Sequence, residues 1–518
     1  MTHALPPAHG QALVIGAGLG GLASAMRLGA KGWRVTVVDR LDRAGGRGSS
    51  LTDQGHRFDL GPTIVTVPQM LRDLWAATGR DFDRDVDLRP LDPFYTIRFQ
   101  DGRQFTMRPG TAAMRAEVAR LSPQDLPGYD RFLREAEARY HFGFQDLGRR
   151  PMHRLIDLIK VLPKFAMMRA DRSIHAHAAA RVTDPALRFA LSFHPLFIGG
   201  DPFRVTSMYG LVSHLEAAFG VHYAMGGVQA IADAMVRVIK DQGGEVRLNT
   251  EADEIVVARG RAAGIRLKTG QHIPAEVTIS NADPGFTYGT LLRNHRKRRW
   301  TDQRLARSRW SMGLFVWYFG TRDTRRMWPD AGHHTILVGP TYREHLRDLF
   351  RAGRITGDMS LYVHRPSVTD PSAAPEGDDT FYALSPVPHL GHGAADWGRF
   401  ADSYKTRVAD MLEPLLPGFR DRLTAERVFT PETFRDRYHS PFGAGFSLEP
   451  RILQSAYFRP HNVSEDLPGL YLAGAGTHPG AGVPGVIGTA EILDQLIPAP
   501  QVRAETPVHP GTLPLAAE

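Results

Sequence analysis

The hydrophobic pattern of the chain begins with a short apolar segment, a cluster of glycines and an amphipathic segment. Residues 13–15 predict a buried strand, residues 22–32 a helix that stops at a glycine, and residues 34–39 a second strand. This order forms a βαβ unit, which builds parallel sheets. A similar mixture of helix and short strands recurs twice. Residues 226–283 predict a helix, a Gly-Gly stop and four short strands, and residues 465–497 again have the pattern of the nucleotide-binding domain. We therefore expect one α/β domain assembled from three separate stretches of chain.

The stretches between these segments have other patterns. Residues 81–222 are mainly of helical type with charged faces, and residues 299–464 are apolar and rich in aromatic residues, with a strand at residues 310–320. The predicted organisation is a nucleotide-binding domain of residues 10–75, 223–298 and 465–497, a helical region at 76–222 and a substrate-binding domain at 299–464. A Pro/Ala-rich tail at 498–518 is predicted to be disordered.

Composition narrows the classes of function only slightly. The 518 residues suffice for roughly two to four domains. The net charge of +8 allows nucleic acid, an anionic membrane or a basic surface as explanations. The lack of cysteine excludes disulfides, thiolate metal sites and a cysteine nucleophile. We expect neither a signal peptide nor a transmembrane helix, because residues 12–26 are broken by four glycines and no longer apolar run occurs.

The first glycine cluster carries the first chemical signal. Gly16 permits a tight turn, Gly18 lets a pyrophosphate approach the backbone, and Gly21 lets the helix lie close to the strand. The amino terminus of the helix then turns free N–H groups towards the phosphates. Asp39 ends the second strand, where a carboxylate accepts both ribose hydroxyls and repels the extra phosphate of NADP. The pattern predicts a dinucleotide site.

Two further features suggest how that site is completed. A flexible Gly-Gly pair followed by Arg47 comes soon after the acid, which suits a second contact to a pyrophosphate. A second glycine-rich loop, residues 474–485, lies near the end of the chain. No second strand with a terminal acid follows this loop, and the chain ends too soon for another βαβ unit. We therefore expect one cofactor that bridges both loops.

The glycine fingerprint, the acid and the Gly-Gly-Arg run, together with "FDLGPTIVTVP" at residues 58–68, resemble the FAD-dependent amine oxidase and carotenoid desaturase superfamily. Four more segments narrow the resemblance: "SFHPLFIGGDPF" (192–203), "YALSPVPHLG" (382–391), "FTPETFRDRY" (429–438) and "GAGTHPGAGVPGVIG" (474–488). With these, residues 10–497 resemble the bacterial-type phytoene desaturases, and most closely those of purple photosynthetic bacteria.

The resemblance implies both a fold and an activity. The implied fold is α/β, with a discontinuous, Rossmann-like FAD-binding domain of the amine oxidase and GDP-dissociation-inhibitor type, an α+β substrate domain and a helical membrane-associated region. The implied cofactor is FAD, and the implied activity is successive desaturation of the C40 carotenoid phytoene, without nicotinamide, to neurosporene, lycopene or both. Desaturation removes a hydride from one carbon, which flavin N5 accepts, and a proton from its neighbour.

The resemblance also assigns residues to the cofactor. The helix predicted from Gly485 points its amino-terminal dipole at the negative charge of the reduced flavin. Val246 matches a backbone contact to adenine. Ala475 stands where many relatives of the wider superfamily have an acid, so a carboxylate contact to the flavin's sugar chain comes from elsewhere or is absent. The predicted cofactor-binding residues are Gly16, Ala17, Gly18, Gly20, Gly21, Asp39, Arg40, Gly46, Arg47, Pro62, Thr63, Val246, Gly474, Ala475, Gly476, Gly485 and Val486.

The proton acceptor is predicted from the resemblance alone. Asp157 and Lys160 lie three residues apart on the helix predicted at residues 154–170, near where the family's acid and base have been placed. A surface ion pair is the alternative, and the family often has arginine at the position of Lys160. His478, in the second glycine loop, is the other catalytic candidate, with a turn histidine as the alternative.

The same helix suggests a membrane surface. Its apolar residues and its cations, among them Arg154, Lys164 and Arg169, would let it lie in the headgroup plane and admit substrate, while a core helix is the alternative. The basic residues 293–300 favour anionic lipid, since no nucleic-acid-binding motif accompanies them. We expect a cytoplasmic protein bound peripherally to the inner or intracytoplasmic membrane. Its expected partners are a membrane-delivered C40 carotenoid and anionic lipid, with no metal and no nucleic acid, and a homo-oligomer stays open.

Two other functions remain open at this stage. Another flavoprotein of the superfamily, such as an amine oxidase, a protoporphyrinogen oxidase or a later carotenoid desaturase, would share the fingerprint. An amine oxidase should show an aromatic pair beside the flavin, and the second glycine loop offers none. A non-catalytic isoprenoid carrier resembling the GDP-dissociation inhibitors would share the fold, but the fully formed second glycine loop argues against it.

Overall fold

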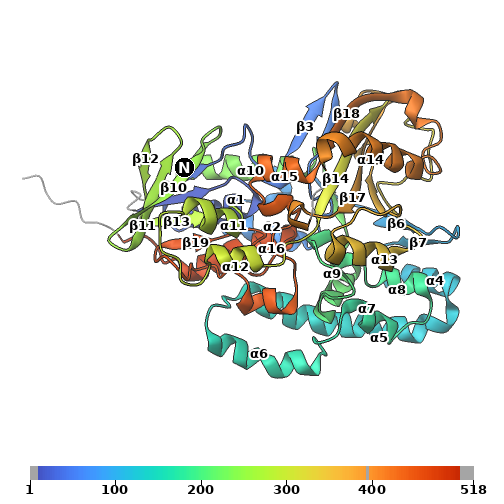
Figure 1. Cartoon of the computed structure of the whole chain (residues 1–518), viewed down its shortest axis with the longest axis horizontal. Helices are drawn as coiled ribbons and strands as arrows, with labels where there is room; N and C mark the ends of the chain where they lie inside the picture. Colours follow the sequence, from blue (N-terminus) through green and yellow to red (C-terminus); the bar gives the residue numbers. More distant parts are fainter. Residues whose placement is uncertain (1–9, 393–395, 502–518) are drawn as a thin grey trace, which may run out of the picture.

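The computed structural model describes residues 10–392 and 396–501 (Figure 1). One half of the molecule is built on a five-stranded parallel sheet of order β19-β13-β1-β2-β9. Its strands are β1 (Gln11–Ile15), β2 (Arg34–Val38), β9 (Glu245–Arg247), β13 (Val277–Ser280) and β19 (Leu470–Leu472). The sheet thus takes strands from three distant stretches of chain, as the hydrophobic pattern predicts for a discontinuous α/β domain.

Both faces of this sheet are covered, which explains why its strands are apolar throughout. Val14 of β1 packs with helices α1 (Leu19–Ala30), α10 (Val228–Asp241) and α16 (Val483–Leu496) on one face. Leu13 and Ile15 turn to the other face, against the antiparallel strands β10 (Ala252–Ala258), β11 (Arg261–Leu267) and β12 (His272–Pro274). The sheet edge at the carboxyl ends of its strands is where glycine loops and helix starts gather.

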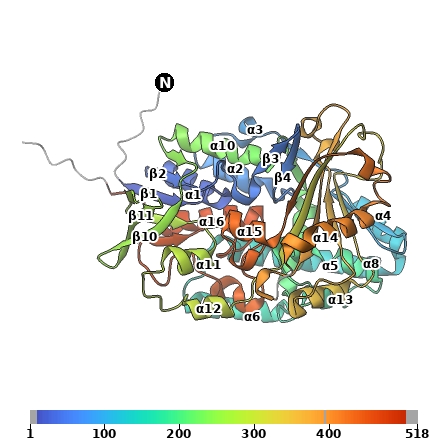
Figure 2. The same ribbon diagram turned by 45° about the horizontal axis from the view of Figure 1, so that its top comes forward.

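A seven-stranded sheet forms the other half, at the opposite end of the molecule in Figure 2. Its strands, in spatial order, are β18 (Leu423–Phe429), β14 (Gly313–Thr321), β17 (Asp379–Val387), β16 (Leu361–His364), β15 (His334–Leu337), β6 (Tyr95–Arg98) and β7 (Gln104–Met107). Strand β14 is buried along its whole length and confirms the strand expected near residues 310–320.

Strands β6 and β7 correct the prediction that residues 81–222 are mainly helical, because both strands lie in that stretch. They form an antiparallel hairpin, and β6 adds to β15 in parallel, so residues 95–107 extend the sheet of the later substrate domain. The signal for this hairpin is present in the sequence. Apolar residues alternate on either side of Asp101-Gly102, a dipeptide typical of tight turns.

A helical layer lies beneath both sheets in Figure 1. It contains α4 (Thr111–Leu121), α5 (Leu126–Arg139), α6 (Leu155–Met167), α7 (Ile174–Ala179), α8 (Pro185–Ala190) and α9 (Leu211–Phe219). Helix α6 runs along the outer edge, and none of its side chains is buried. In residues 10–392 and 396–501, no helix combines the length and apolarity needed to cross a bilayer.

The remaining elements connect these layers. They are β3 (Ser50–Asp53), β4 (His56–Asp59), α2 (Pro68–Ala76), α3 (Phe82–Asp85), β5 (Leu88–Pro90), β8 (His222–Ala224), α11 (Pro284–Phe286), α12 (Asp302–Arg307), α13 (Tyr342–Arg347), α14 (Trp397–Leu412) and α15 (Pro431–Tyr438). At the end of the chain, the Pro498 carbonyl accepts a hydrogen bond from Trp33 Nε1 at 3.0 Å. Most of the predicted tail, residues 502–518, lies outside the described residues.

Candidate cofactor and substrate site

The two glycine loops meet at the carboxyl edge of the parallel sheet. Asn281, at the end of β13, lies between them and donates from Nδ2 to the Gly16 carbonyl at 3.3 Å. A Cβ placed on Gly20 would come within 3.1 Å of Gly474 Cα and 2.8 Å of Asn281 Oδ1. One placed on Gly474 would lie 2.5 Å from the same amide oxygen. Glycine is therefore required where the loops touch, and Asn281 is a site residue that the sequence reading missed.

Each loop leads into the start of a helix. Helix α1 has Gly18 as its N-cap, and a Cβ on Gly21 would lie 2.2 Å from the Gly16 carbonyl oxygen, in agreement with the close helix-to-strand packing expected there. Helix α16 begins at Val483, two residues before the predicted start, and a Cβ on Gly485 would lie 2.5 Å from the Gly480 oxygen. Two helix amino termini, with their free N–H groups, thus point into one region.

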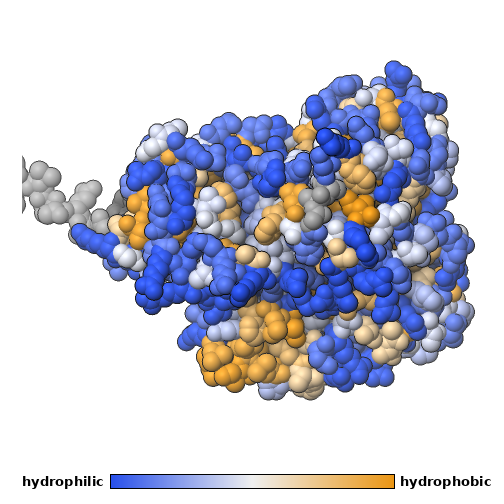
Figure 3. Space-filling view, viewed as in Figure 1, coloured by the Kyte–Doolittle hydropathy of each residue, from blue (hydrophilic) through white to orange (hydrophobic). Residues whose placement is uncertain are grey.

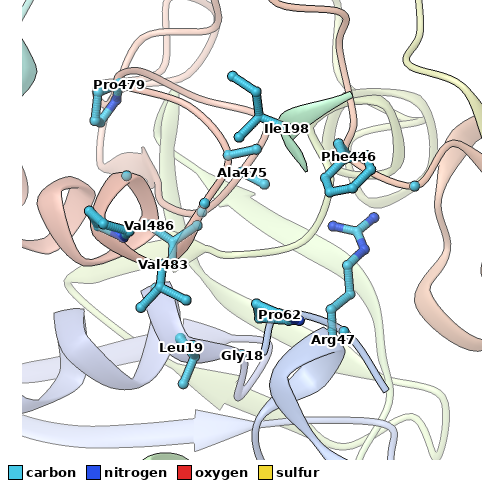
Figure 4. Close-up of a pocket in the computed structure, with 18 of the residues that line it drawn as sticks. Gly18, Leu19, Arg47, Pro62, Ile198, Phe446, Ala475, Pro479, Val483 and Val486 are labelled. Carbon is cyan, nitrogen blue, oxygen red and sulfur yellow. The ribbon is translucent and has the colours of Figure 1, made fainter. Parts of the chain in front are cut away.

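This region is a single cavity of about 790 Å³. Thirteen of the predicted cofactor-binding residues line it: Gly16, Gly18, Gly20, Asp39, Arg40, Gly46, Arg47, Pro62, Thr63, Gly474, Ala475, Gly485 and Val486. Figure 4 shows Gly18, Leu19 and Pro62 on one side, with Val483 and Val486 facing them. One ligand can therefore contact both loops, which answers why the chain has two of them.

Four predicted residues do not line the cavity. Ala17 donates its backbone N–H to Asp39 Oδ2 at 2.7 Å and so positions that carboxylate. A Cβ on Gly476 would lie 2.1 Å from Pro284 Cδ, so Gly476, like Gly21, permits close packing. Val246 pairs with Val37 in β9, the edge strand of the parallel sheet. Residues 250–252 line the cavity instead of Val246. They follow the carboxyl end of β9, and the cavity lies at the carboxyl ends of the strands.

The charged residues of the cavity suit a nucleotide. Asp39 lies at the end of β2, where its Oδ1 accepts the Leu41 N–H at 2.8 Å, and burial raises its pKa. Arg47 donates from Nη2 to Ser440 Oγ at 2.6 Å and extends into the cavity towards Phe446 (Figure 4). Its buried Nε has no partner among the described residues. Burial lowers the pKa of Arg47, and the nearby Asp283 carboxylate raises it.

These residues fit FAD. At the glycines of both loops the backbone is accessible, whereas a side chain there would fill the space for the cofactor. The starts of α1 and α16 offer N–H groups, and Arg47 supplies a positive charge with an unpaired Nε donor. Asp39 lines the cavity at the end of β2, the position of a ribose-binding acid. No carboxylate replaces the one that Ala475 lacks within its own loop, residues 474–485.

Arg47→Ala should weaken FAD binding by roughly 10- to 100-fold, because a hydrogen bond to a charged group contributes about 1.5–3 kcal/mol. The dissociation constant is measured by quenching of FAD fluorescence on titration with FAD-free protein. Arg43→Ala is the matched control, since Arg43 lies four residues earlier and does not line the cavity. Equal losses in both variants would contradict a specific role for Arg47.

The same cavity continues away from the glycine loops as an apolar channel. Leu196, Phe197, Val212, Tyr382 and Phe446 belong to its walls. It then reaches the helical layer, where the lining residues are Leu158, Leu162 and Phe165 of α6, together with Ile452 and Leu453. Leu453 is 70% exposed, so the channel ends at the protein surface beside α6.

The predicted acid–base pair lies outside this cavity. The Asp157 carboxylate accepts the backbone N–H of Arg154 at 3.1 Å and so caps the start of α6. Lys160 is exposed to solvent. Leu158, Leu162 and Phe165 take the inward side of the helix, which turns the charged pair away from the channel. Their catalytic role stays a prediction without a contact that supports it.

His478, in contrast, does line the cavity. Its Nε2 lies 2.9 Å from the Leu147 carbonyl and 3.1 Å from the Arg150 carbonyl, so Nε2 carries the proton in the assigned tautomer. Burial lowers the pKa of His478 to about 4. The ring is therefore neutral at pH 7 and anchors the second glycine loop to the helical layer.

A cluster of histidines supports the far wall of the channel. Within the described ranges, His333, His334 and His364 bring ring nitrogens within 4.8 Å of one another, and burial lowers the pKa of all three. His334 Nδ1 lies 2.7 Å from the Tyr362 hydroxyl, which lies 2.8 Å from Thr63 Oγ1. The cluster thus fixes two hydroxyl groups at the cavity wall.

Comparison with known proteins agrees with this site. The chain matches the family of flavin containing amine oxidoreductases over residues 19–492. It is 65% identical over 497 residues to the phytoene desaturase (neurosporene-forming) of Cereibacter sphaeroides, covering 96% of either chain. It is 66% identical over 502 residues to the enzyme of the same name from Rhodobacter capsulatus, covering 96% of this chain and 95% of that one.

A more distant likeness concerns the fold alone. The crystal structure of a Rab GDI from Plasmodium falciparum superimposes with a TM-score of 0.54 at 10% identity, over 95% of this chain and 98% of the other. The alternative of a carrier rests on this fold-level likeness, whereas the full-length relatives are oxidoreductases. The chain therefore belongs to the flavin containing amine oxidoreductases and, among them, to the phytoene desaturases.

Proposed function

We propose that the protein is an FAD-dependent phytoene desaturase that introduces successive double bonds into phytoene and forms neurosporene. One observation carries this proposal: a single cavity joins both glycine loops to an apolar channel that ends at an exposed apolar helix. A cofactor that accepts hydride and a long hydrocarbon can thus occupy one continuous space. The names of the two full-length relatives support neurosporene, rather than lycopene, as the product.

The protein's own residues divide the work along this space. Bound FAD supplies the acceptor for the hydride that leaves the substrate. The glycines of residues 16–20 admit its pyrophosphate, and the N–H groups at the start of α16 face the end of the cavity where negative charge develops. The aliphatic and aromatic walls bind the hydrocarbon and exclude water, which strengthens every electrostatic interaction at the reacting carbons.

The proposal extends to the membrane as the source of substrate. Leu155, Ile156, Ile159, Leu162 and Met167 of α6 are exposed, together with Ile452 and Leu453. Figure 3 displays the resulting apolar patch over α6 at the lower edge of the molecule. Because Leu162, Ile452 and Leu453 also line the channel, a bilayer that covers this patch would deliver hydrocarbon to the channel mouth without passage through water. The cations on α6, Lys160 and Lys164, would then attract anionic headgroups.

Asp157 and Lys160 can be tested for catalysis and for membrane contact in one experiment. Lys160→Ala should lower binding to anionic liposomes about fivefold, because one lysine near such a surface contributes about 1 kcal/mol. The kcat in detergent micelles should fall less than about threefold for Lys160→Ala and Asp157→Asn, since neither residue lines the cavity. A loss of kcat greater than about a hundredfold, with normal liposome binding, would instead establish the pair as acid and base.

Product analysis tests the proposed function. Purified protein, FAD and phytoene in anionic liposomes are incubated in air, and carotenoids are separated and identified by their absorption spectra. We expect neurosporene as the end product, with intermediates of lower conjugation at early times. Lycopene as the main product would limit the proposal to phytoene desaturation in general, and no coloured product from protein that retains FAD would refute it.

A further inference from the structure

The proposed reaction needs a proton acceptor inside an apolar cavity. Among the described residues that line it, four carry carboxylates: Asp39, Glu216, Glu251 and Asp283. Asp39 and Glu251 belong to the end where the first loop and residues 250–252 meet, as the hydrogen bond from the Thr250 N–H to the Asp39 carbonyl shows. Asp283 caps α11 and lies near Arg47. Only Glu216 comes from the helical layer that encloses the apolar channel.

Glu216 is buried, with 2% of its surface exposed, and one oxygen of its carboxylate has two polar partners. The Tyr95 hydroxyl donates to Glu216 Oε2 at 2.8 Å, and His194 Nε2 lies 3.2 Å from the same oxygen. Burial and the charge of Glu216 raise the pKa of Tyr95 well above its usual value, so Tyr95 remains a donor. The Tyr95 hydroxyl donates its only proton to Glu216. In the 3.1 Å contact between Tyr95 and His194, the donor is therefore His194 Nε2. Two donors on Oε2 offset the desolvation of the carboxylate and leave Oε1 for the cavity.

Glu216 and His194 line the same cavity as both glycine loops. His194 opens the 3₁₀ helix η5 (His194–Ile198), and Ile198 at its other end lies 3.7 Å from where a Cβ on Gly482 of the second loop would be. Glu216 is thus connected, through His194 and η5, to the loop that closes the cofactor site.

We propose that Glu216 is the proton acceptor of the desaturation, with Tyr95 and His194 as positioning residues; this inference rests on the proposed function. Bound FAD would accept the hydride, which leaves one carbon with its electron pair. The proton leaves the neighbouring carbon for Glu216 Oε1, and the electron pair of that C–H bond becomes the new π bond. Because a proton beside an electron-deficient carbon is strongly acidic, a carboxylate is a sufficient base.

The test replaces the carboxylate by its uncharged isostere. Glu216→Gln should lower kcat by about 10²- to 10⁴-fold, the usual contribution of general acid–base catalysis, with FAD content and KM for phytoene within about twofold of the wild type. Glu137→Gln, an exposed position on α5, is the matched control and should leave all three unchanged. A Glu216→Gln variant with more than about a third of the wild-type kcat would overturn the proposal.

A second readout does not depend on turnover. Infrared difference spectra of FAD-free protein, wild type against Glu216→Gln, should contain one carboxylate band that the variant lacks. Tyr95→Phe deletes the hydroxyl that donates to Glu216 Oε2 and with it one of the two contacts that position the carboxylate. The frequency of that band should therefore shift and kcat should fall, while FAD content stays unchanged. A band and a kcat that both equal those of the wild type would assign the proton to another group.

Different results would refute the assignment of Glu216 and the proposed function. If wild-type protein holds FAD and desaturates phytoene but Glu216→Gln does so equally well, only the assignment of Glu216 is wrong. If wild-type protein with bound FAD leaves phytoene unchanged, the proposed function itself is wrong, whatever the infrared band shows.

Discussion

Gly18→Val should abolish the retention of FAD while the protein stays folded. Gly18 has extended backbone angles, φ −72° and ψ 167°, which any residue adopts, so the substitution introduces no backbone strain. A Cβ there would lie 2.8 Å from Asn281 Nδ2, so that amide must shift and lose its hydrogen bond to the Gly16 carbonyl, which costs about 1 kcal/mol and leaves the fold intact. The added methyl groups fill the cavity where the pyrophosphate approaches the start of α1. Affinity for FAD should fall more than about a hundredfold, since close backbone approach is lost together with its hydrogen bonds.

Flavin absorbance per mole of purified protein measures this effect, and thermal unfolding of both FAD-free proteins shows whether the fold survives. Gly332→Val is the control, because a Cβ there has no neighbour within 4 Å and Gly332 does not line the cavity. A yellow Gly18→Val protein with full FAD occupancy would contradict the placement of the pyrophosphate at this loop.

Replacement of Leu155, Ile159 and Met167 by glutamate should release the protein from anionic liposomes. These α6 side chains are 58%, 51% and 75% exposed, and none lines the cavity. Full burial of one such side chain stabilises by about 1.5–3 kcal/mol, so three of them, partly inserted, contribute on the order of 4 kcal/mol. Binding to liposomes should therefore fall by at least about a hundredfold, and repulsion from anionic lipid adds to the loss.

The activity of this variant should depend on how substrate is supplied. With phytoene in liposomes it should drop in proportion to binding, and in detergent micelles it should remain within about twofold, because the cofactor loops are untouched. A variant with Val257, Met327 and Val368 changed to glutamate carries the same charge at exposed apolar positions outside α6. If both triple variants lose liposome binding equally, the apolar patch over α6 is not the membrane contact.

The cofactor loops were the part of the molecule most open to prediction, because their signals are local. The turn at Gly16, the acid at the end of the strand and the second glycine loop each occupy a few neighbouring residues, and their geometry follows from backbone constraints that glycine alone relieves. The idea of one cofactor across both loops also agrees with the cavity, since Gly20 and Gly474 come into contact.

What the sequence pattern missed depends on contacts between distant segments. Asn281 is an ordinary residue after a strand until that strand is known to lie between β1 and β19. Leu453 has no periodic signal, and it gains meaning only because its segment faces α6, almost 300 residues earlier. Glu216 sits in a short apolar helix, and its partners Tyr95 and His194 come from a strand and a turn that no local rule brings together. Asp157 illustrates the converse, because a helix-capping acid and a catalytic acid look alike in sequence, and its catalytic role stays a prediction.

The central claim is that phytoene in the channel reduces the flavin held by the two loops. Mixing the FAD-bound protein anaerobically with phytoene in liposomes, while flavin absorbance and carotenoid spectra are recorded together, tests it most directly. We expect that the flavin bleaches as the polyene lengthens, with one flavin reduced per double bond formed, and that added nicotinamide cofactors change neither. Polyene formation with the flavin still oxidised, or bleaching without any new double bond, would contradict it.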